Sequence, residues 1–517
     1  MPNITINEVN ATTRTPLTTT DANPIAIIGT ATKGDIPTGM TYGEPVMCAT
    51  LDEFTLNFGS TPPSSGYYGV LVAREALMAG NTVLYTRIAK ADAIVKSSVE
   101  VPGVDKSSPG TSDTANSETK VLKIEAISGG TDGNNIAVEL EDSGSEYIVY
   151  TFLNSRLVHT GRFSNDIENL KTTISEDGIV FKNSYIQITA IKSGAAYNWT
   201  TTLVPAWETT PKSGILAKYA LANGADGDNM TGTEINTALT GILNKLTDKS
   251  LYDFIMLVTP GLSDFDDVDL PKLYKEFSSQ RDDAVCVLDC KRDSTSSEVL
   301  IDLGLDEVRE SYNQMAVFFP WFTMYSDILG KNVLVPPSMA YVKSFARNQT
   351  DGIPCRAVAG PSNSSLTDVI SVTDRVGSAI SKQLNDQYIN PIVYNRNYGY
   401  FIDGNNVFNP IAENRTYGQL SIRYTLCYIK KKLDDICYRL SYAANSTIIR
   451  TQLQGAISSI LDSLKIGQYI FGYKVEIVDS PTDTADGVVH ANVSIFPTPA
   501  LEEFIINLRI VNVEENL

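Results

Sequence analysis

The chain has 517 residues, of which 43% are hydrophobic, and its formal net charge is −19. A chain of this length can bury several hydrophobic cores, and length alone predicts roughly three or four domains. Proteins that bind nucleic acid need a dense basic surface, yet the chain has 41 lysines and arginines against 60 acidic residues, which argues against that class. The acidic excess is expected to keep a large body soluble.

The N-terminal residues MPNITINEVNATTRTP lack the basic region and following apolar stretch of a signal peptide. No later segment approaches the roughly twenty apolar residues that are needed to cross a bilayer. We therefore expect a soluble, cytosolic chain without direct membrane insertion. The 6 cysteines are spread along the chain and several lie in apolar runs, which favours small buried residues over a disulfide scaffold.

The opening segment, residues 1–23, alternates polar and apolar residues, with Ile4, Ile6 and Val9 at apolar positions. A period of two with β-branched residues predicts a strand or an extended arm. The segment has too little apolar mass to fold alone.

Residues 24–100 follow a different pattern. The apolar run PIAIIGTATKGD predicts a buried strand that ends in a glycine turn, VLVAREALMA predicts a helix, and VLYTRIA predicts the next strand. This order predicts an N-terminal α/β domain. The next range, 101–215, begins with a stretch rich in Ser, Pro, Gly, Asp and Thr and continues with the short alternating runs VLKIEAI, NIAVEL, EYIVYTF and YIQITAI, so we expect a β-rich inserted domain.

Residues 216–395 alternate helical patterns with strands. EINTALTGILNKL places Ile235, Leu239, Ile242 and Leu246 on one helical stripe. The near-continuous apolar runs DFIMLVTP, AVCVLDC and MAVFFPWFTM predict strands that are covered on both faces of a mostly parallel, doubly wound sheet.

Residues 396–499 predict an α+β domain. Apolar residues recur at spacings of four and three from Ile422 to Leu440, which predicts a long amphipathic helix. A second helix is expected after a cap at 445–447, with Gly467 as its stop, and two alternating strands follow at 473–477 and 489–495. The other faces of the first helix carry basic residues: Arg423, Lys430, Lys431, Lys432 and Arg439.

The last segment, residues 500–517, predicts one more alternating strand after the breaker Pro-Thr-Pro. Its apolar positions are Phe504, Ile506, Leu508 and Ile510. Both ends of the chain are therefore predicted to be extended.

A search for chemistry yields no candidate catalytic, cofactor-binding or metal-binding residue. His159 and His490 fall in different predicted domains, and neither accompanies a nucleophile motif. GTATKGD has the glycine spacing of a phosphate-binding loop, but Asp35 stands where its lysine is needed. Asp226 to Asn229 lacks the glutamate of a calcium loop, and Cys286 with Cys290 lacks two further zinc ligands.

The run Lys430 to Lys432 leaves two interpretations of equal weight. It is either a binding surface for an acidic partner or a solvated helix face, and a concentrated basic patch is locally unusual on so acidic a chain.

The order of these segments resembles the contractile tail sheath family of myophages, which extends to tail-like bacteriocins and contractile injection systems. PIAIIGTATKG and EPVMCATLDEFTLNFG resemble the first domain of the family, AISGGTDGNNIAVEL the start of its β-sandwich insert, and LANGADG the start of its subtilisin-like domain. VPPSMAYVKSFARNQTDGIPCRAVAG and LNDQYINPIVYNRNYGYFIDGN are similar to later segments, although NRNYGYFIDG replaces the usual Trp-Gly-x-x-Thr phrase. The final helices and strands resemble the C-terminal sheath domain, so the likeness covers most of the chain in the right order.

The resemblance implies an α/β multidomain fold with a subtilisin-like central domain, an outward-facing β-sandwich insert and a C-terminal domain that faces a tail tube. No histidine lies between Thr231 and Pro391, so the central domain lacks the catalytic triad of that fold. The basic helix from Arg423 to Arg439 is our hypothesis for the tube-facing surface.

The resemblance also implies a function and partners. Six copies would form a ring, rings would stack helically around a tail tube, and the arms 1–23 and 500–517 would add strands to neighbouring subunits. Contraction from a strained extended state would drive the tube through the target envelope, without a nucleotide or other cofactor. Baseplate and tail terminator proteins would be further partners, and the chain would belong to a virion tail that is assembled in the host cytoplasm.

Three alternatives remain beside a phage sheath. One is the sheath of a tailocin or of a non-phage contractile injection system. Another is a different self-assembling protein, such as a strand-adding adaptor or a surface-layer protein, which would explain the extended ends alone. An enzyme of the α/β class would explain the central sheet, but the sequence contains no nucleophile, base or cofactor motif.

Overall fold

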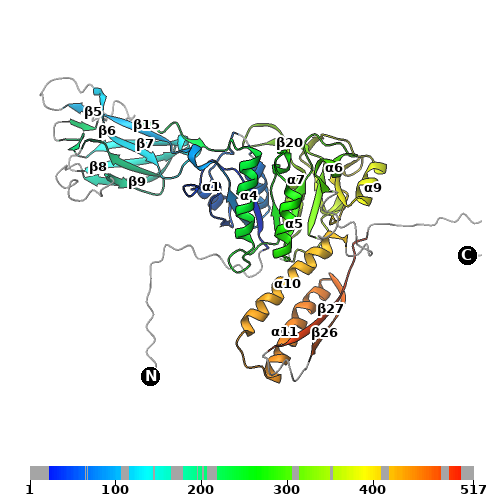
Figure 1. Cartoon of the computed structure of the whole chain (residues 1–517). Helices are drawn as coiled ribbons and strands as arrows, with labels where there is room; N and C mark the ends of the chain where they lie inside the picture. The colour runs from blue at the N-terminus through cyan, green and yellow to red at the C-terminus, as the bar shows by residue number, and fades with distance from the viewer. Residues whose placement is uncertain are drawn as a thin grey trace, which may run out of the picture.

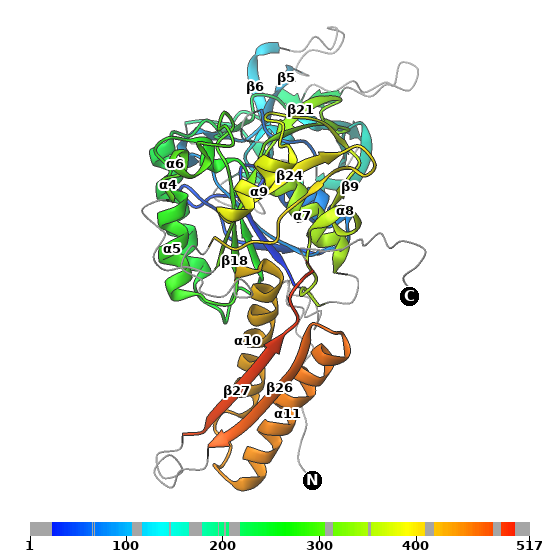
Figure 2. The same cartoon turned by 90° about the vertical axis from the view of Figure 1, so that its right-hand side faces the viewer.

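The computed structural model describes residues 23–64, 66, 68–105, 116–143, 146–164, 178–194, 196–200, 203–205, 218–305, 314–349, 353–408, 418–478 and 488–501. The described chain has three parts: a central α/β body, an elongated β-rich insert on one side of it, and a slender C-terminal unit of two helices and a hairpin (Figure 1, Figure 2). No helix among the described residues combines the length and the apolar character needed to cross a membrane.

The body is built on a nine-stranded, mostly parallel sheet. Its order is β2 (Val46–Cys48), β3 (Val83–Arg87), β1 (Ile25–Gly29), β17 (Met256–Val258), β18 (Val285–Asp289), β19 (Met315–Phe319), β24 (Ile389–Asn395), β25 (Gly399–Ile402) and β22 (Ser365–Leu366). The strands from β3 to β24 are parallel, and the outer strands are antiparallel. Strands from 24–100 and from 216–395 thus share one sheet, with β1 in parallel pairing with β17.

Two hydrophobic cores lie on opposite faces of this sheet, because the alternate residues of β1 belong to different cores. On one face lie α1 (Leu51–Phe58), α2 (Tyr68–Met78), α7 (Pro337–Asn348) and the start of α10 (Leu420–Leu440). The other face is covered by α4 (Gly232–Leu246), α5 (Leu270–Gln280) and α9 (Ser378–Asp386). The stripe predicted on α4 is buried as expected, and the helix begins with a capping box between Thr231 and Glu234.

The run MAVFFPWFTM, predicted as one strand, forms two strands in different sheets, so that prediction is wrong. Proline has no backbone N–H and cannot continue the ladder of a central strand, and the break falls at Pro320. After it, β20 (Phe322–Ser326) pairs with β21 (Lys331–Val335) and β23 (Val369–Val372) in a three-stranded antiparallel sheet. The intervening Trp321 is fully buried, and its Nε1 donates to the Cys290 carbonyl at 2.7 Å.

The insert consists of two antiparallel sheets. One has the order β10 (Ile179–Lys182), β11 (Ile186–Ala190), β6 (Asn116–Ala126), β5 (Ser98–Asp105) and β14 (Leu203–Pro205). The other has the order β15 (Lys218–Ala220), β7 (Ile136–Asp142), β8 (Glu146–Leu153) and β9 (Arg156–Ser164). Both sheets contribute to one core, which includes Ile124, Ile188, Val138 and Val149.

The C-terminal unit contains the outer half of α10, α11 (Thr447–Ile466), β26 (Ile470–Val478) and β27 (His490–Pro497). Ser446 caps α11 by accepting from the backbone N–H of Ile449, and the helix ends before Gly467, as predicted. The hairpin packs on α11 around a small core that includes Ile457, Leu461 and Leu464.

The remaining elements are short. They are η1 (Ala91–Ala93), β4 (Ile94–Val95), η2 (Thr131–Asn135), β12 (Lys192–Ser193), β13 (Ala196–Tyr197), β16 (Ala225–Asp226), η3 (Leu262–Asp264), α6 (Val299–Asp302) and α8 (Gly360–Asn363).

Candidate functional site

The hairpin of the C-terminal unit is a two-stranded sheet in which β26 pairs with β27. Within the described ranges no further strand joins either of them, so both outer edges lack a strand partner. A lone two-stranded hairpin is only marginally stable in water, and an open edge is a template for another strand. The hairpin is therefore the candidate surface for strand addition.

Large apolar side chains are exposed at the end of the hairpin where the chain leaves it. Phe471 is 69% exposed and Phe496 is 60% exposed, close together because Gly472 pairs with Phe496. Ile466, at the end of α11, is 84% exposed, and Leu501 is 73% exposed. Exposed aromatic and aliphatic groups beside open strand edges are typical of a surface that another chain covers.

The predicted arm residues cannot be placed against this surface. Ile4, Ile6 and Val9 at one end, and Phe504, Ile506, Leu508 and Ile510 at the other, lie outside the described residues. Their role in linking subunits stays a prediction.

The basic helix is α10, and two of its lysines bind acidic residues of the body. Lys430 Nζ lies 2.7 Å from Asp282 Oδ2, and Lys431 Nζ lies 2.9 Å from Asp283 Oδ2 and 2.5 Å from Asp253 Oδ1. These acids precede β17 and β18, at the amino-terminal ends of two central strands of the sheet. The two lysines therefore fasten α10 to the body.

The pairing extends to two further basic groups. Asp282 also accepts from Lys249 at 2.7 Å, and these hydrogen bonds lower the pKa of Asp282. Asp283 accepts from the buried Arg281 at 2.9 Å. Burial alone would raise the pKa of Asp283, but Lys431 and Arg281 hold that pKa below its ordinary value.

The other three predicted basic residues are dispersed along α10. Arg423 is half-buried, and this burial lowers the pKa of its guanidinium. Lys432 lies 5.4 Å from the centre of the Tyr428 ring, and the exposed Arg439 binds Asp435 one turn earlier. The five side chains thus do not form one continuous basic surface, and whether α10 faces a tube stays a prediction.

Helix α10 belongs to two hydrophobic cores. Its residues Leu420, Tyr424 and Cys427 pack in the core of the body, whereas Ile429 packs in the core of the C-terminal unit. The Tyr424 ring lies 5.0 Å from the ring of Phe345 in α7. Because a continuous helix joins them, the body and the C-terminal unit are connected without a flexible linker at this point.

The junction between body and insert centres on Arg87, which the sequence analysis missed. Arg87 is 1% exposed, and its guanidinium donates to the carbonyls of Gly34, Gly129 and Asp226, the last at 2.8 Å. The Asp226 carboxylate in turn accepts from the backbone N–H of Thr131 at 2.6 Å. Asp226 therefore joins β16 to η2 at this junction.

The glycines of the sequence AISGGTDGNN fit this junction. Gly130 has a φ of +126°, and a Cβ on it would lie 2.0 Å from the Thr32 carbonyl oxygen. The paired glycines were the signal that could have indicated a close backbone approach here.

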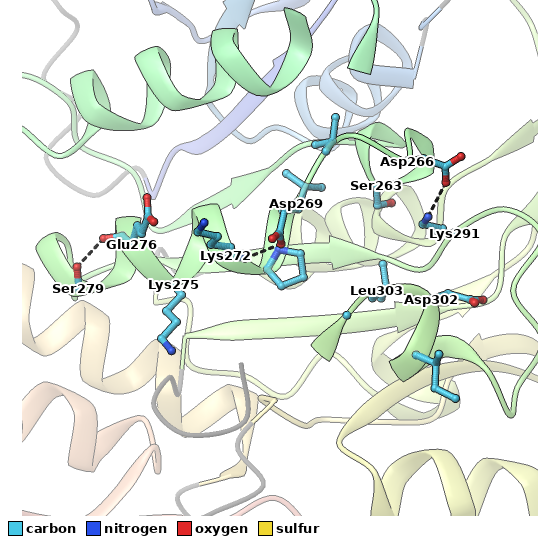
Figure 3. Close-up of a pocket in the computed structure, with 15 residues that line it drawn as sticks. Ser263, Asp266, Asp269, Lys272, Lys275, Glu276, Ser279, Lys291, Asp302 and Leu303 are labelled. Atoms are coloured by element: carbon cyan, nitrogen blue, oxygen red, sulfur yellow. Dashed lines mark hydrogen bonds and ion pairs between the residues drawn. The ribbon is translucent and has the colours of Figure 1, made fainter. Parts of the chain in front are cut away.

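A groove of about 810 Å³ lies between η3, α5 and α6 (Figure 3). Three of its charged groups have partners next to the groove: Lys291 Nζ lies 2.8 Å from Asp266 Oδ1, and Asp269 caps α5 by accepting from the backbone N–H of Lys272. No histidine or cysteine lines it among the described residues. It brings no nucleophile and base together.

The body also buries a carboxylate beside a serine. Asp289, at the end of β18, accepts from the backbone N–H of Ser338 at 2.6 Å, from its Oγ at 2.8 Å, and from the Gly261 N–H at 3.1 Å. Burial raises the pKa of Asp289 to about 6 in spite of these bonds. A serine triad would need a histidine at this place, and the sequence has none from Thr231 to Pro391. The pair joins β18 to the start of α7.

The histidines and cysteines weighed in the sequence lie apart from one another. His159 Nδ1 is 3.2 Å from Asn183 Nδ2 in the insert, and His490 begins β27. Cys286 and Cys290 are fully buried in the body core. The described residues contain no group of three His, Cys, Asp or Glu side chains that could hold a metal ion.

Comparisons with known proteins give structural relatives alone. No family model matches the chain, and no curated protein matches its sequence. The sheath tail protein of Desulfitobacterium hafniense is similar with a TM-score of 0.59 and 14% identity over 96% of both chains. The sheath tail protein of Listeria innocua has a TM-score of 0.56 and 13% identity, over 92% of this chain and 95% of its own. The contracted helical sheath of the anti-feeding prophage has a TM-score of 0.52 and 12% identity over 98% of both chains.

These likenesses confirm the resemblance at the level of the fold. The chain has the mixed α/β, multidomain fold of tail sheath proteins over almost its full length.

Proposed function

We propose that the chain is a sheath subunit that polymerises into stacked hexameric rings around a tail tube. The observation that carries the proposal is the likeness to sheath proteins over 96% of the chain, which includes the insert and the C-terminal unit as well as the common α/β body. A fold alone does not fix a function, and a serine-triad enzyme would need a histidine beside the Ser338–Asp289 pair, whereas the sequence has none from Thr231 to Pro391.

The open hairpin supports a linkage by strand addition. Segments 1–23 and 500–517 of neighbouring copies would each pair with one outer edge of β26 or β27. Main-chain hydrogen bonds would supply affinity, and the alternating apolar side chains would set the register. The two outer edges that are open among the described residues match in number the two terminal segments that the sequence predicts to be extended, as a continuous lattice of identical subunits would require.

Contraction would use two alternative packings of the same subunit surfaces. The extended packing would have the higher free energy, and a barrier would hold it until a baseplate releases it. No cofactor is required for such a step. The central body would be a subtilisin-like domain without a triad, the insert would face outward, and the C-terminal unit would face the tube.

Further partners follow from this role. They are a tail tube protein, a baseplate and a tail terminator, in a virion tail assembled in the host cytoplasm. The sheath of a tailocin or of another contractile injection system is the alternative, since one of the similar structures is a helical sheath of the anti-feeding prophage.

Electron microscopy of the purified chain tests the proposal. Under assembling conditions we expect hollow tubes with six-fold symmetry, and we expect a variant lacking residues 1–20 to stay folded without forming tubes. Far-ultraviolet circular dichroism of the truncated chain serves as the control for folding. Discrete monomers of the full chain would contradict the proposal, and normal tubes from the truncated chain would contradict the role of the N-terminal arm.

A further inference from the structure

We propose that Gln419 is a positioning residue that fixes the point at which the C-terminal segment leaves the folded chain. The inference rests on the proposed role of that segment as a link between subunits. It concerns Ala500 and Leu501, the described residues at the start of the segment.

The side chain of Gln419 makes two reciprocal hydrogen bonds with the backbone of Ala500. Its Nε2 donates to the Ala500 carbonyl at 3.3 Å, and its Oε1 accepts from the Ala500 N–H at 2.8 Å. An amide that both donates to and accepts from one residue copies the exchange of hydrogen bonds between paired strands. Ala500 and Leu501 are the described residues of segment 500–517, so this clamp holds the segment at its start.

Gln419 does not use its side chain for the helix that it precedes. It stands at the N-cap of α10, but its side chain makes no capping hydrogen bond there. Ser, Thr, Asp and Asn are the residues that favour this position. Gln419 is 4% exposed, and its buried amide reaches across to the returning chain.

The backbone around Gln419 is held on both sides. Gln419 forms an antiparallel bridge with Asn406, and the Leu420 N–H donates to the Asn405 carbonyl at 2.7 Å. The Asn405 side chain accepts from the Ser421 N–H at 3.1 Å and donates to the Ser421 Oγ at 3.0 Å. These bonds fix the start of α10 against residues 405 and 406.

Residue Asn390 continues the connection into the central sheet. Its buried side chain accepts from the Asn406 N–H at 2.7 Å and donates to the Asn406 carbonyl at 2.9 Å. The same Nδ2 donates to the carbonyl of Val317 in β19 at 3.0 Å. A series of hydrogen bonds thus runs from Ala500 through Gln419, Asn406 and Asn390 to a central strand.

Loss of the clamp would lengthen the part of the chain that must be ordered during assembly. The preceding backbone bond is from the Thr498 N–H to the Tyr469 carbonyl at 3.1 Å. Without Gln419, residues 499–501 would lose their attachment to the start of α10. Ordering them would then oppose assembly, because immobilising backbone at an interface costs conformational entropy.

The test compares the full chain with the variants Gln419→Met and Gln454→Met. Methionine keeps the length of the side chain and removes both the donor Nε2 and the acceptor Oε1 of its amide. Gln454 is the matched control, because its Nε2 donates to the Val475 carbonyl within the same unit, away from Ala500. The readouts are hydrogen exchange of a peptide that contains Ala500, the thermal midpoint of the subunit, and the critical concentration for tube formation.

For Gln419→Met we expect faster hydrogen exchange at Ala500. The critical concentration for tube formation should rise roughly tenfold. The thermal midpoint should be like that of Gln454→Met. Gln419→Asn keeps a neutral amide on a side chain that is one methylene shorter, so it should fall between the two. This variant also serves if the methionine variant fails to fold.

Unchanged exchange at Ala500 would overturn the clamp. Exchange at Ala500 could become faster while the critical concentration stays unchanged or rises no more than in Gln454→Met. Either result would overturn the role of the clamp in assembly. If the unaltered chain forms no tubes, the proposed function fails, and the role in assembly fails with it. The exchange rate at Ala500 still decides whether the clamp exists.

Discussion

Lys431 Nζ lies 2.9 Å from Asp283 Oδ2, and this contact joins α10 to the loop between α5 and β18. The side chain of Asp283 is 4% exposed, and it also binds the fully buried Arg281. The guanidinium of Arg281 stacks on Phe254, with 4.0 Å between Cζ and the ring centre. The Asp283 carboxylate therefore pairs with two cations, Lys431 and Arg281, and Arg281 has no contact with solvent.

Replacing Asp283 by alanine should destabilise the subunit by about 3–5 kcal/mol, because it leaves Arg281 buried without its acidic partner. Replacing Asp282 by alanine is the matched control: its pairs with Lys430 and Lys249 are half exposed, so we expect a loss of about 1 kcal/mol or less. Urea unfolding of both variants measures the difference. Equal losses of unfolding free energy in the two variants would show that the buried Asp283–Arg281 pair stabilises the subunit no more than the half-exposed pairs of Asp282.

Stability should increase on acidification through Asp289. The pKa of Asp289 in the folded chain is about 6, above its ordinary value of 3.8, so the folded state binds the proton more tightly than the unfolded state. The contribution of this group to the free energy of unfolding is therefore full below about pH 4 and is lost as the pH rises through 6.

The variant Asp289→Asn isolates the effect, since asparagine does not titrate. The free energy of unfolding of the unaltered chain, relative to that of the variant, should rise by about 2 kcal/mol between pH 7 and pH 4. Denaturant unfolding at several pH values measures it. A difference that stays constant across this range would contradict the raised pKa.

Gly130→Ala should loosen the junction between body and insert. The added Cβ would lie 2.0 Å from the Thr32 carbonyl oxygen at a φ of +126°, so backbone has to move, and we expect a loss of about 2–4 kcal/mol. Gly39→Ala is the control, because Gly39 also has a positive φ, +82°, but has open space around it. The Gly39→Ala control should lose only about 1 kcal/mol of unfolding free energy.

Thermal unfolding of both glycine variants gives the comparison. If Gly130→Ala and Gly39→Ala lower the thermal stability equally, the close approach at Thr32 adds no destabilisation, and the positive φ alone accounts for the loss.

The tube-facing hypothesis for α10 is tested best at Lys432 and Arg439. Reversing Lys430 or Lys431 would also break their contacts with Asp282 and Asp283, so weaker tube binding could come from a displaced helix. We expect Lys432→Glu with Arg439→Glu to weaken co-sedimentation with purified tail tubes about fivefold, or ~1 kcal/mol.

The control for this pair is Lys474→Glu on β26, which makes the same kind of charge change elsewhere in the C-terminal unit. Co-assembly that is unaffected by the double variant, or equally affected by Lys474→Glu, would refute the assignment of the tube-facing surface to α10.

Local patterns predicted most of the regular elements, because the period of apolar residues records which face of a segment is buried. The stripe from Ile235 to Leu246 is one example, and the two long helices after Ile422 are others. The strand break at Pro320 could have been predicted, since proline cannot continue a central strand, but the sequence analysis considered only the apolar character of MAVFFPWFTM.

Long-range polar pairs were not predictable in the same way. Lys430 and Asp282 are 148 positions apart, and a loop aspartate has no periodicity that would indicate its partner. Arg87 is similar, because a buried arginine that binds three carbonyls looks in sequence like any basic residue at the end of a strand. The two strands of the open hairpin were predicted from the sequence. Only the structure shows that, within the described chain, no further strand pairs with them.

The insert leaves and rejoins the body at one place. Val95 in β4 pairs with Ala225 in β16, and the Ser98 N–H donates to the Ala222 carbonyl at 2.9 Å, so the outgoing and returning strands are neighbours (Figure 1). The strands of the central sheet come from outside this loop of chain. A foreign domain whose own termini lie close together could therefore be grafted between these two strands while the body keeps its sheet, which would make the chain a scaffold for displaying domains at regular intervals.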